Sequence, residues 1–198
     1  MLQKLIKSAL TQAAEHAERI SRDEAVVSSI ENAIKLLVHC FKNGGRVFSC
    51  GNGGSLCDAM HFAEELSGRF RQDRSPLPAL AIIDPGHITC TGNDFGYDQI
   101  FSRYLEAHAR QGDILLAVST SGKSPNIIKA AQTARNLGVK TIGLTGRPLS
   151  PLSPWLEIDI CTEGKTPWAD RIQEMHIKVI HTLIEGVEYE LFASEGAQ

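Results

Sequence analysis

The sequence predicts an α/β fold, with a parallel sheet, helices on both faces of that sheet and a helical extension before the first strand. Three observations support this prediction. Short aliphatic runs alternate with longer helical patterns, two of these runs end in Gly- or Ser-rich loops that open a helix, and two helical patterns come before any strand. Strands that alternate with helices form parallel sheets with right-handed crossovers. We therefore expect one domain, with residues 1–43 as the extension and residues 44–198 as the α/β core.

The composition argues against several classes of protein. The 198 residues include 20 Lys and Arg against 23 Asp and Glu, which gives a formal charge of -3 without a basic stripe, so nucleic acid is not an expected partner. Five scattered cysteines without CxxC spacing argue against disulfides and a thiolate zinc site, and favour a cytoplasmic location. The chain has no export signal pattern and no apolar run of about 18 residues, so we expect no membrane association.

The first two helical patterns cover residues 2–20 and 23–43, and the second pattern ends at Gly44-Gly45. Apolar residues recur along both at helical spacing, and glycine commonly follows the last turn of a helix. An extension of this kind packs either on a sister subunit or on its own sheet. The sequence leaves both arrangements open.

The first expected strand covers residues 46–50 and leads into a tight turn, Gly51-Asn52-Gly53-Gly54-Ser55, that opens a helix reaching about Ser67. Backbone N–H groups at a helix N-terminus favour an anion. Glycines are needed in tight turns whether or not a ligand binds, so this junction alone is weak evidence for a site.

A Ser/Thr loop follows the most aliphatic run of the chain, residues 114–118, and is the stretch Ser119-Thr120-Ser121-Gly122-Lys123-Ser124-Pro125. Ser124 is a good N-cap, and Pro125 fits the first turn of the next helix. The four hydroxyls and the helix N-terminus favour a phosphate monoester. A loop that only caps its helix is the alternative interpretation. The spacing differs from that of a Walker A loop, which argues against nucleotide hydrolysis.

The remaining elements bring the expected total to four or five strands. They are a strand at 80–83, a short helical pattern carrying His87, a polar turn at 92–97, and a helix at 98–108. After the Ser/Thr loop come a helix at 126–137, a strand at 140–145, a loop at 146–154, a strand at 157–161 and a helix at about 168–192. Ligands collect at the carboxyl ends of parallel strands, so two anion-favouring junctions in one sheet are better evidence than one.

Two pairs of polar residues are candidates for a metal site or a proton-transfer pair. His61 and Glu65 stand four residues apart, on one face of a helix, a spacing also common in solvated surface contacts. Gln173 and His181 are eight residues apart, about 12 Å along a helix axis. They either converge on one ion or belong to sites in different subunits. Together the four would suit zinc or a similar divalent ion.

These stretches resemble the phosphoheptose isomerase family of the sugar isomerase (SIS) domain superfamily, and the resemblance spans nearly the whole chain. The motifs that carry it are Cys50-Gly51-Asn52-Gly53-Gly54-Ser55, Asp58-Ala59-Met60-His61-Phe62-Ala63-Glu64-Glu65-Leu66, Gly92-Asn93-Asp94-Phe95-Gly96, Ser119-Thr120-Ser121-Gly122, and the run from Ala169 to His181. The resemblance implies a flavodoxin-like SIS sandwich in a cytoplasmic homotetramer. It also implies isomerisation of sedoheptulose 7-phosphate to D-glycero-D-manno-heptose 7-phosphate, an early step towards the heptose of lipopolysaccharide core.

Carried over by position, the resemblance assigns residues to three roles. The implied zinc ligands are His61, Glu65, Gln173 and His181. The implied substrate-binding residues are Asn52, Gly53, Gly54, Glu65, Asn93, Asp94, Ser119, Thr120, Ser121, Ser124 and Gln173. The chain departs from the family pattern at Leu56 and at Pro148-Leu149, which replaces a Gly-rich turn.

An aldose–ketose isomerisation moves a proton between C1 and C2, so it requires an acid/base pair. Glu65 and His181 are the candidates for that pair. The alternative function is a non-catalytic SIS adaptor, similar to the protein that binds the bacterial replication initiator. A third is a sugar-phosphate sensor, which is usually fused to a DNA-binding domain. His181 together with Asn93-Asp94-Phe95-Gly96 favours the enzyme.

Overall fold

The computed structural model describes residues 1–71, 73–165 and 168–192. Its centre is a five-stranded sheet with all strands parallel, in the order β2-β1-β3-β4-β5. The strands are β1 (Val47–Cys50), β2 (Ala79–Ala81), β3 (Ile114–Ser119), β4 (Lys140–Thr145) and β5 (Ile158–Cys161). This flavodoxin-like order confirms the predicted α/β fold.

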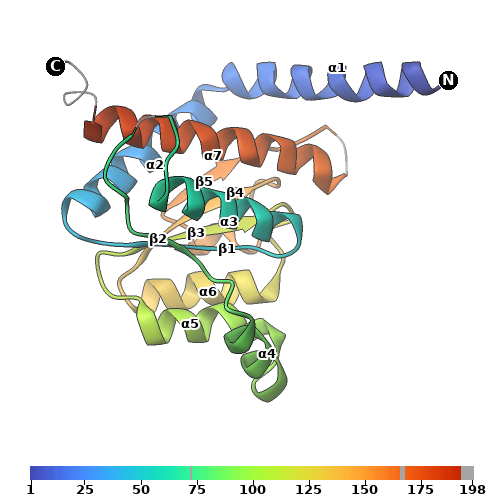
Figure 1. Cartoon of the computed structure of the whole chain (residues 1–198). Coiled ribbons are helices and arrows are strands. Elements are labelled where there is room, and N and C mark those ends of the chain that lie inside the picture. Colours follow the sequence, from blue (N-terminus) through green and yellow to red (C-terminus); the bar gives the residue numbers. More distant parts are fainter. Residues whose placement is uncertain (72, 166–167, 193–198) are drawn as a thin grey trace.

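Helices cover both faces of the sheet. The helices α2 (Glu24–Lys42), α3 (Gly54–Ser67) and α7 (Ala169–Phe192) lie on one face, and α5 (Ile100–His108) and α6 (Pro125–Asn136) lie on the other (Figure 1). Alternate residues of β3 enter the two cores: Leu116 joins the core under α2, α3 and α7, whereas Leu115 joins the core under α5 and α6. Burial on both faces explains why the strand is a continuous aliphatic run.

The strand order places the two predicted junctions side by side. After β1 the chain moves outward to β2 and then returns to the other side of β1 as β3, so β1 and β3 are neighbours. A parallel sheet has a crevice at the carboxyl ends of its strands where the order reverses in this way. The glycine turn follows β1 and the Ser/Thr loop follows β3, so both lie at this crevice.

Two predicted boundaries in the middle of the chain are wrong. The strand predicted at 80–83 is β2 at Ala79–Ala81, because pairing with β1 begins at Ala79. The turn predicted at 92–97 begins only at Phe95, since its first three residues form the last turn of α4 (Pro85–Asp94). The Asp84 carboxylate caps α4 by accepting from the His87 N–H at 2.5 Å. The other boundaries agree within one or two residues.

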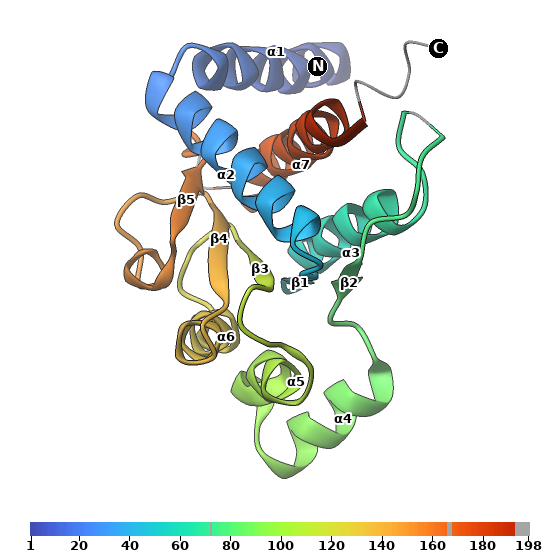
Figure 2. The same ribbon diagram turned by 90° about the vertical axis from the view of Figure 1, so that its left-hand side faces the viewer.

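The helix α1 (Leu2–Ser21) has no buried residue and lies outside both cores. Figure 2 shows it above α2 and α7, and Figure 1 shows its N-terminal part projecting beyond α7. Its apolar residues Leu2, Leu5, Ile6 and Leu10 are exposed. In the part of the chain that the structure describes, no helix is long and apolar enough to cross a membrane.

A buried histidine joins α7 to the end of β4. The His176 side chain is fully buried, and its Nε2 lies 3.1 Å from the Thr145 carbonyl oxygen, to which it donates. Among the described residues its Nδ1 has no hydrogen-bond partner. Burial, partly offset by the Thr145 bond, lowers the pKa of His176 from 6.5 to about 4.

We predict that His176 makes the folded state acid-sensitive. Because its pKa is lower in the folded chain, its contribution to stability is complete above pH 6.5 and is lost as the pH falls towards 4. The shift corresponds to roughly 3 kcal/mol at most. The variant His176→Gln keeps a donor for Thr145 and should flatten the dependence of unfolding free energy on pH in this range. The exposed His39→Gln is the control, and equal slopes in all three proteins would contradict the prediction.

Candidate active site

A pair of side-chain amides joins the two junctions at the crevice. Asn52 follows β1 and Asn126 lies in the first turn of α6, and each Nδ2 donates to the other's Oδ1 at 2.9 Å. The Tyr97 hydroxyl also donates to Asn52 Oδ1, at 3.0 Å. Asn126 is only 2% exposed. The pair therefore fixes the glycine turn relative to the Ser/Thr loop.

The glycine turn brings α3 close to α7. Gly53 has a φ of 55°, a backbone conformation that side chains disfavour. A Cβ on Gly54 would lie 2.6 Å from Gln173 Nε2 and 2.8 Å from Oε1. Only glycine at position 54 therefore leaves room for the Gln173 amide in this position.

Backbone hydrogen bonds fix two hydroxyl groups of the Ser/Thr loop. The Gly122 N–H donates to Ser119 Oγ at 3.1 Å, and the Lys123 N–H donates to Ser121 Oγ at 3.2 Å. Each hydroxyl oxygen thus accepts from the backbone and keeps its own hydrogen to donate to a ligand. Ser124 occupies the N-cap of α6, as predicted, but its side chain makes no capping hydrogen bond in the described structure. Thr120 is half-buried between these residues.

The segment after β4 supports the Ser/Thr loop from one side. The Leu152 N–H donates to the Gly122 carbonyl at 3.1 Å, and a Cβ on Gly122 would lie 2.1 Å from Ser150 Oγ. At the tip of the segment Leu149 has a φ of 53° and is 95% exposed. A non-glycine residue there is strained, so the departure from a Gly-rich turn is accommodated by an unusual backbone conformation.

Three of the four implied metal ligands meet within one chain. His61 and Glu65 lie on α3 and His181 lies on α7, and one ligand atom from each falls within 4.8 Å of the others. The two imidazole Nε2 atoms are 2.9 Å apart, and His61 Nε2 is 3.4 Å from Glu65 Oε1. Two imidazoles and a carboxylate are a common donor set for zinc. The residues present therefore fit a divalent metal ion.

The fourth implied ligand, Gln173, lies at the other end of the contact between α3 and α7. Its amide contacts Gly54, whereas His181 contacts His61. From the first contact to the second, the residue number rises by seven on α3 and by eight on α7. Because both numbers rise in the same direction, the two helices run parallel, and the two contacts are about 11 Å apart along them. One contact adjoins the glycine turn. The other lies at the group of His61, Glu65 and His181, which we call the metal-type cluster.

Burial shifts the pKa of two side chains on this contact. Burial, and then the neighbouring His61, lowers the pKa of His181, so its imidazole stays neutral near pH 7. Burial raises the pKa of Asp58 to about 6. In the described residues Asp58 Oδ2 is buried without a hydrogen-bond partner. Asp58 stands four residues after Gly54 and three before His61, a helical spacing that could have identified it from the sequence.

Asn93 and Asp94 lie in the last turn of α4 and are exposed. Asn93 Nδ2 donates to Asp94 Oδ1 at 2.7 Å, and Cys90 Sγ lies 3.6 Å from Asp94 Oδ2. In the described chain no hydrogen bond joins either residue to the two junctions. The structure therefore brings together the other implied substrate-binding residues, at the crevice and along the α3–α7 contact, but not these two. The sequence analysis did not identify Asn126, Tyr97 or Asp58.

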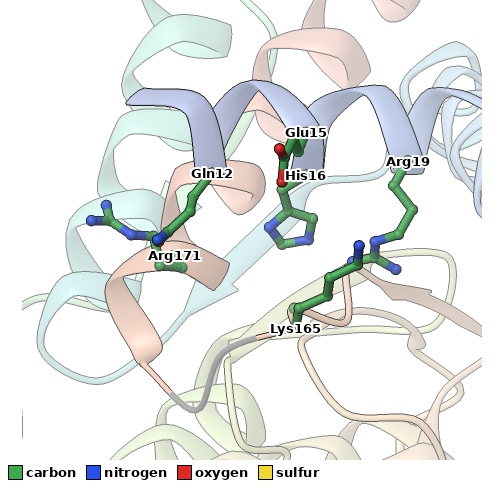
Figure 3. Close-up of a pocket in the computed structure, with 7 residues that line it drawn as sticks. Gln12, Glu15, His16, Arg19, Lys165 and Arg171 are labelled. Carbon is green, nitrogen blue, oxygen red and sulfur yellow. The ribbon is translucent and has the colours of Figure 1, made fainter. Parts of the chain in front are cut away.

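A separate small cavity of about 60 Å³ lies between α1, the segment before α7 and the first turn of α7 (Figure 3). His16 points into the space between these elements, and its Nε2 lies 3.1 Å from the Thr162 carbonyl oxygen. The cavity contains none of the implied site residues. It belongs to the packing of α1. Its lining is Gln12, Glu15, His16, Arg19, Gly164, Lys165 and Arg171.

Comparisons with known proteins agree on one family. The SIS domain family description matches residues 10–146. The phosphoheptose isomerase of Enterobacter sp. (strain 638) is 53% identical over 194 residues, which cover 96% of this chain and 99% of the relative. The phosphoheptose isomerase of Escherichia coli O7:K1 is 52% identical, over the same shares of each chain.

Solved structures agree with these relatives. A phosphoheptose isomerase from Francisella tularensis superposes with a TM-score of 0.88 at 33% identity, covering 94% of this chain and 98% of that chain. The phosphoheptose isomerase of Neisseria gonorrhoeae gives a TM-score of 0.87 at 32% identity, covering 95% and 99%.

We predict that the Ser/Thr loop binds inorganic phosphate. Replacing Ser119 and Ser121 by Ala removes two donors worth about 1 kcal/mol each, so the affinity should fall about 10- to 100-fold. Isothermal titration calorimetry with phosphate measures this change. Ser28→Ala, at an exposed position of α2, is the control. Unchanged affinity in the double variant would place the anion site elsewhere.

Proposed function

The chain belongs to the phosphoheptose isomerase family of SIS domain proteins, and from that premise we propose which of its residues carry the reaction. It is an aldose–ketose isomerase that converts sedoheptulose 7-phosphate to D-glycero-D-manno-heptose 7-phosphate, for the heptose of lipopolysaccharide core. The observation that supports this function best is the cluster of His61, Glu65 and His181 on the same helix pair as the Gly54–Gln173 contact. A non-catalytic adaptor has no need of such a cluster.

The substrate lies across the crevice between β1 and β3. The Ser/Thr loop and the N-terminus of α6 hold its phosphate, because the hydroxyls of Ser119 and Ser121 keep hydrogens to donate. Thr120 and Ser124 add two further hydroxyls. Asn52, Gly53, Gly54 and Gln173 bind the sugar. Asn93 and Asp94, which are exposed on α4, are assigned to the sugar by the family resemblance alone.

Glu65 and His181 are the acid/base pair. In the ketose-to-aldose direction a base removes a proton from C1, and O2 gains a proton, which gives an enediol. The proton on O1 then leaves as C2 gains one, so the substrate is rearranged without any net change in protons. Glu65 is suited to remove the proton from C1 and to deliver one to C2. His181, neutral near pH 7 because of its burial, is suited to the transfers at the oxygens.

His61, Glu65 and His181 would hold one zinc ion per subunit. The compact donor set supports this assignment. Gln173 lies about 11 Å from this cluster along the helices, so it would complete the ligand set only from another subunit. When bound, zinc would polarise the carbonyl or hold the two reacting oxygens in place. A side chain bound to zinc does not act freely as a base, so either a ligand leaves the ion during turnover or the ion has a structural or template role.

The active protein is a cytoplasmic homotetramer with dihedral symmetry, and the whole chain forms one domain of it. The exposed apolar residues of α1 support assembly, since the chain itself leaves them uncovered. A second copy provides an apolar surface of matching chemistry. The cysteines are all free thiols in the structure, as expected in a reducing compartment.

We predict that Glu65→Gln and His181→Asn each lower kcat by about 10²- to 10⁴-fold without unfolding the protein. Both changes nearly preserve shape and remove the capacity for proton transfer. Turnover of sedoheptulose 7-phosphate, measured with and without a chelator, tests this, with circular dichroism to show that the variants fold. Glu106→Gln on the exposed surface of α5 is the control. Near-parental turnover in either folded variant would refute the acid/base assignment.

We predict that the active protein has a mass of about 86 kDa, four times the chain mass of 21.6 kDa. Leu5 and Leu10 on α1 are 66% and 68% exposed in the single chain. Placing two charges in an apolar interface through Leu5→Glu and Leu10→Glu should reduce the mass measured by light scattering. Lys4→Glu, on the same helix, controls for added charge. A monomer mass for an active parent preparation would rule out the tetramer.

A further inference from the structure

We propose that the buried ion pair between Arg74 and Glu188 is a positioning device for the isomerase site. Glu65 lies in the last turn of α3, and His181 lies on α7. The ion pair fixes the position of that turn along the axis of α7. The inference rests on the proposed function, because it takes Glu65 and His181 as the reacting pair. Arg74 itself lies in the segment that connects α3 to β2.

The pair is almost completely removed from solvent. Arg74 Nε donates to Glu188 Oε1 at 2.9 Å, and the two side chains are 1% and 4% exposed. The second carboxylate oxygen of Glu188 accepts from the Arg71 N–H at 3.3 Å. A buried ion pair adds little net stability, because removing both charges from water offsets their attraction. The free-energy cost of burying the two charges is explained if the ion pair fixes the position of α3 relative to α7.

The other end of the Arg74 side chain holds the backbone of α3. Nη2 donates to the Glu65 carbonyl oxygen at 2.9 Å, and Nη1 donates to the Leu66 carbonyl oxygen at 2.7 Å. Carbonyls at the C-terminus of a helix have no partner within the helix. The rigid guanidinium fork satisfies two of them while its Nε binds Glu188. One side chain therefore ties the backbone of Glu65 directly to α7.

The position of this tie relative to His181 gives it a functional consequence. Glu188 lies seven residues after His181, so both side chains project from the same face of α7, about 10 Å apart. Arg74 thus ties the backbone of Glu65, a member of the metal-type cluster, to a point on α7 two turns beyond His181. A shift of about 1 Å between Glu65 and His181 is enough to reduce turnover about 100-fold.

A double variant separates positioning from stability. Replacing both charges, in Arg74→Met with Glu188→Met, leaves no unpaired buried charge, so the fold should survive. We expect phosphate affinity within about twofold of the parent, since the Ser/Thr loop is on another part of the sheet. The affinity of the metal-free protein for Zn²⁺, measured by calorimetry, should fall about 10- to 100-fold, and kcat should fall more than KM changes.

The neighbouring surface pair is a matched control. Arg71 also bonds to α7, through Glu185, but these side chains are 57% and 47% exposed. The variant Arg71→Met with Glu185→Met should keep parental zinc affinity and turnover, because exposed ion pairs contribute little. A folded Arg74→Met/Glu188→Met protein with zinc affinity and kcat within twofold of the parent overturns the proposal.

A conservative variant tests the same point if the double variant does not fold. Arg74→Lys keeps the charge beside Glu188 but loses the fork that holds the Glu65 and Leu66 carbonyls. It should lower zinc affinity and kcat, and parental values would overturn the proposal. A parent protein that neither binds Zn²⁺ nor isomerises its substrate refutes the proposed function as well, whereas an active parent with unaffected variants refutes only the role of Arg74 and Glu188.

Discussion

The parallel contact between α3 and α7 is the constraint on which the rest of the site depends. At its start, the absence of a side chain on Gly54 lets Gln173 lie against the first turn of α3. Two turns later His181 meets His61. Because α3 begins at the glycine turn, the crevice and the metal-type cluster belong to one rigid pair of helices. A change in the distance or register of these helices would alter both together.

The sheet supplies the second half of the site. Reversal of strand order between β1 and β3 places a glycine turn beside a hydroxyl-rich loop, and the Asn52–Asn126 amide pair joins them. Two amides that each donate to the other need a narrow geometry, because hydrogen bonds weaken steeply when misaligned. The Ser/Thr loop and the metal-type cluster are therefore positioned by different interactions, a hydrogen-bonded amide pair at the sheet and a contact between two helices.

Local patterns made most of the fold and part of the site predictable. Aliphatic runs identified the strands, and the spacing of His61 and Glu65 placed both on one face of α3. Contacts between distant segments could not be predicted in this way. Nothing near Asn126 shows that its amide pairs with Asn52, and nothing near Arg74 shows that Glu188 lies beside it. The limits of β2 depended on its pairing with β1, and α4, capped at its start by Asp84, continues through the turn-forming residues Gly92, Asn93 and Asp94.

The placement of His181 on the last helix has a consequence for synthesis of the chain. Glu65 leaves the ribosome 116 residues before His181 (181 minus 65), which takes roughly 6 to 23 seconds at ordinary elongation rates. During that interval one face of the nascent sheet lacks α7, which contributes nine buried residues to the finished protein. A partly made chain has neither the full donor set nor a closed core on that face. Exposed apolar surface of this kind favours aggregation until α7 docks, so the core on that face closes only when translation has supplied the last helix.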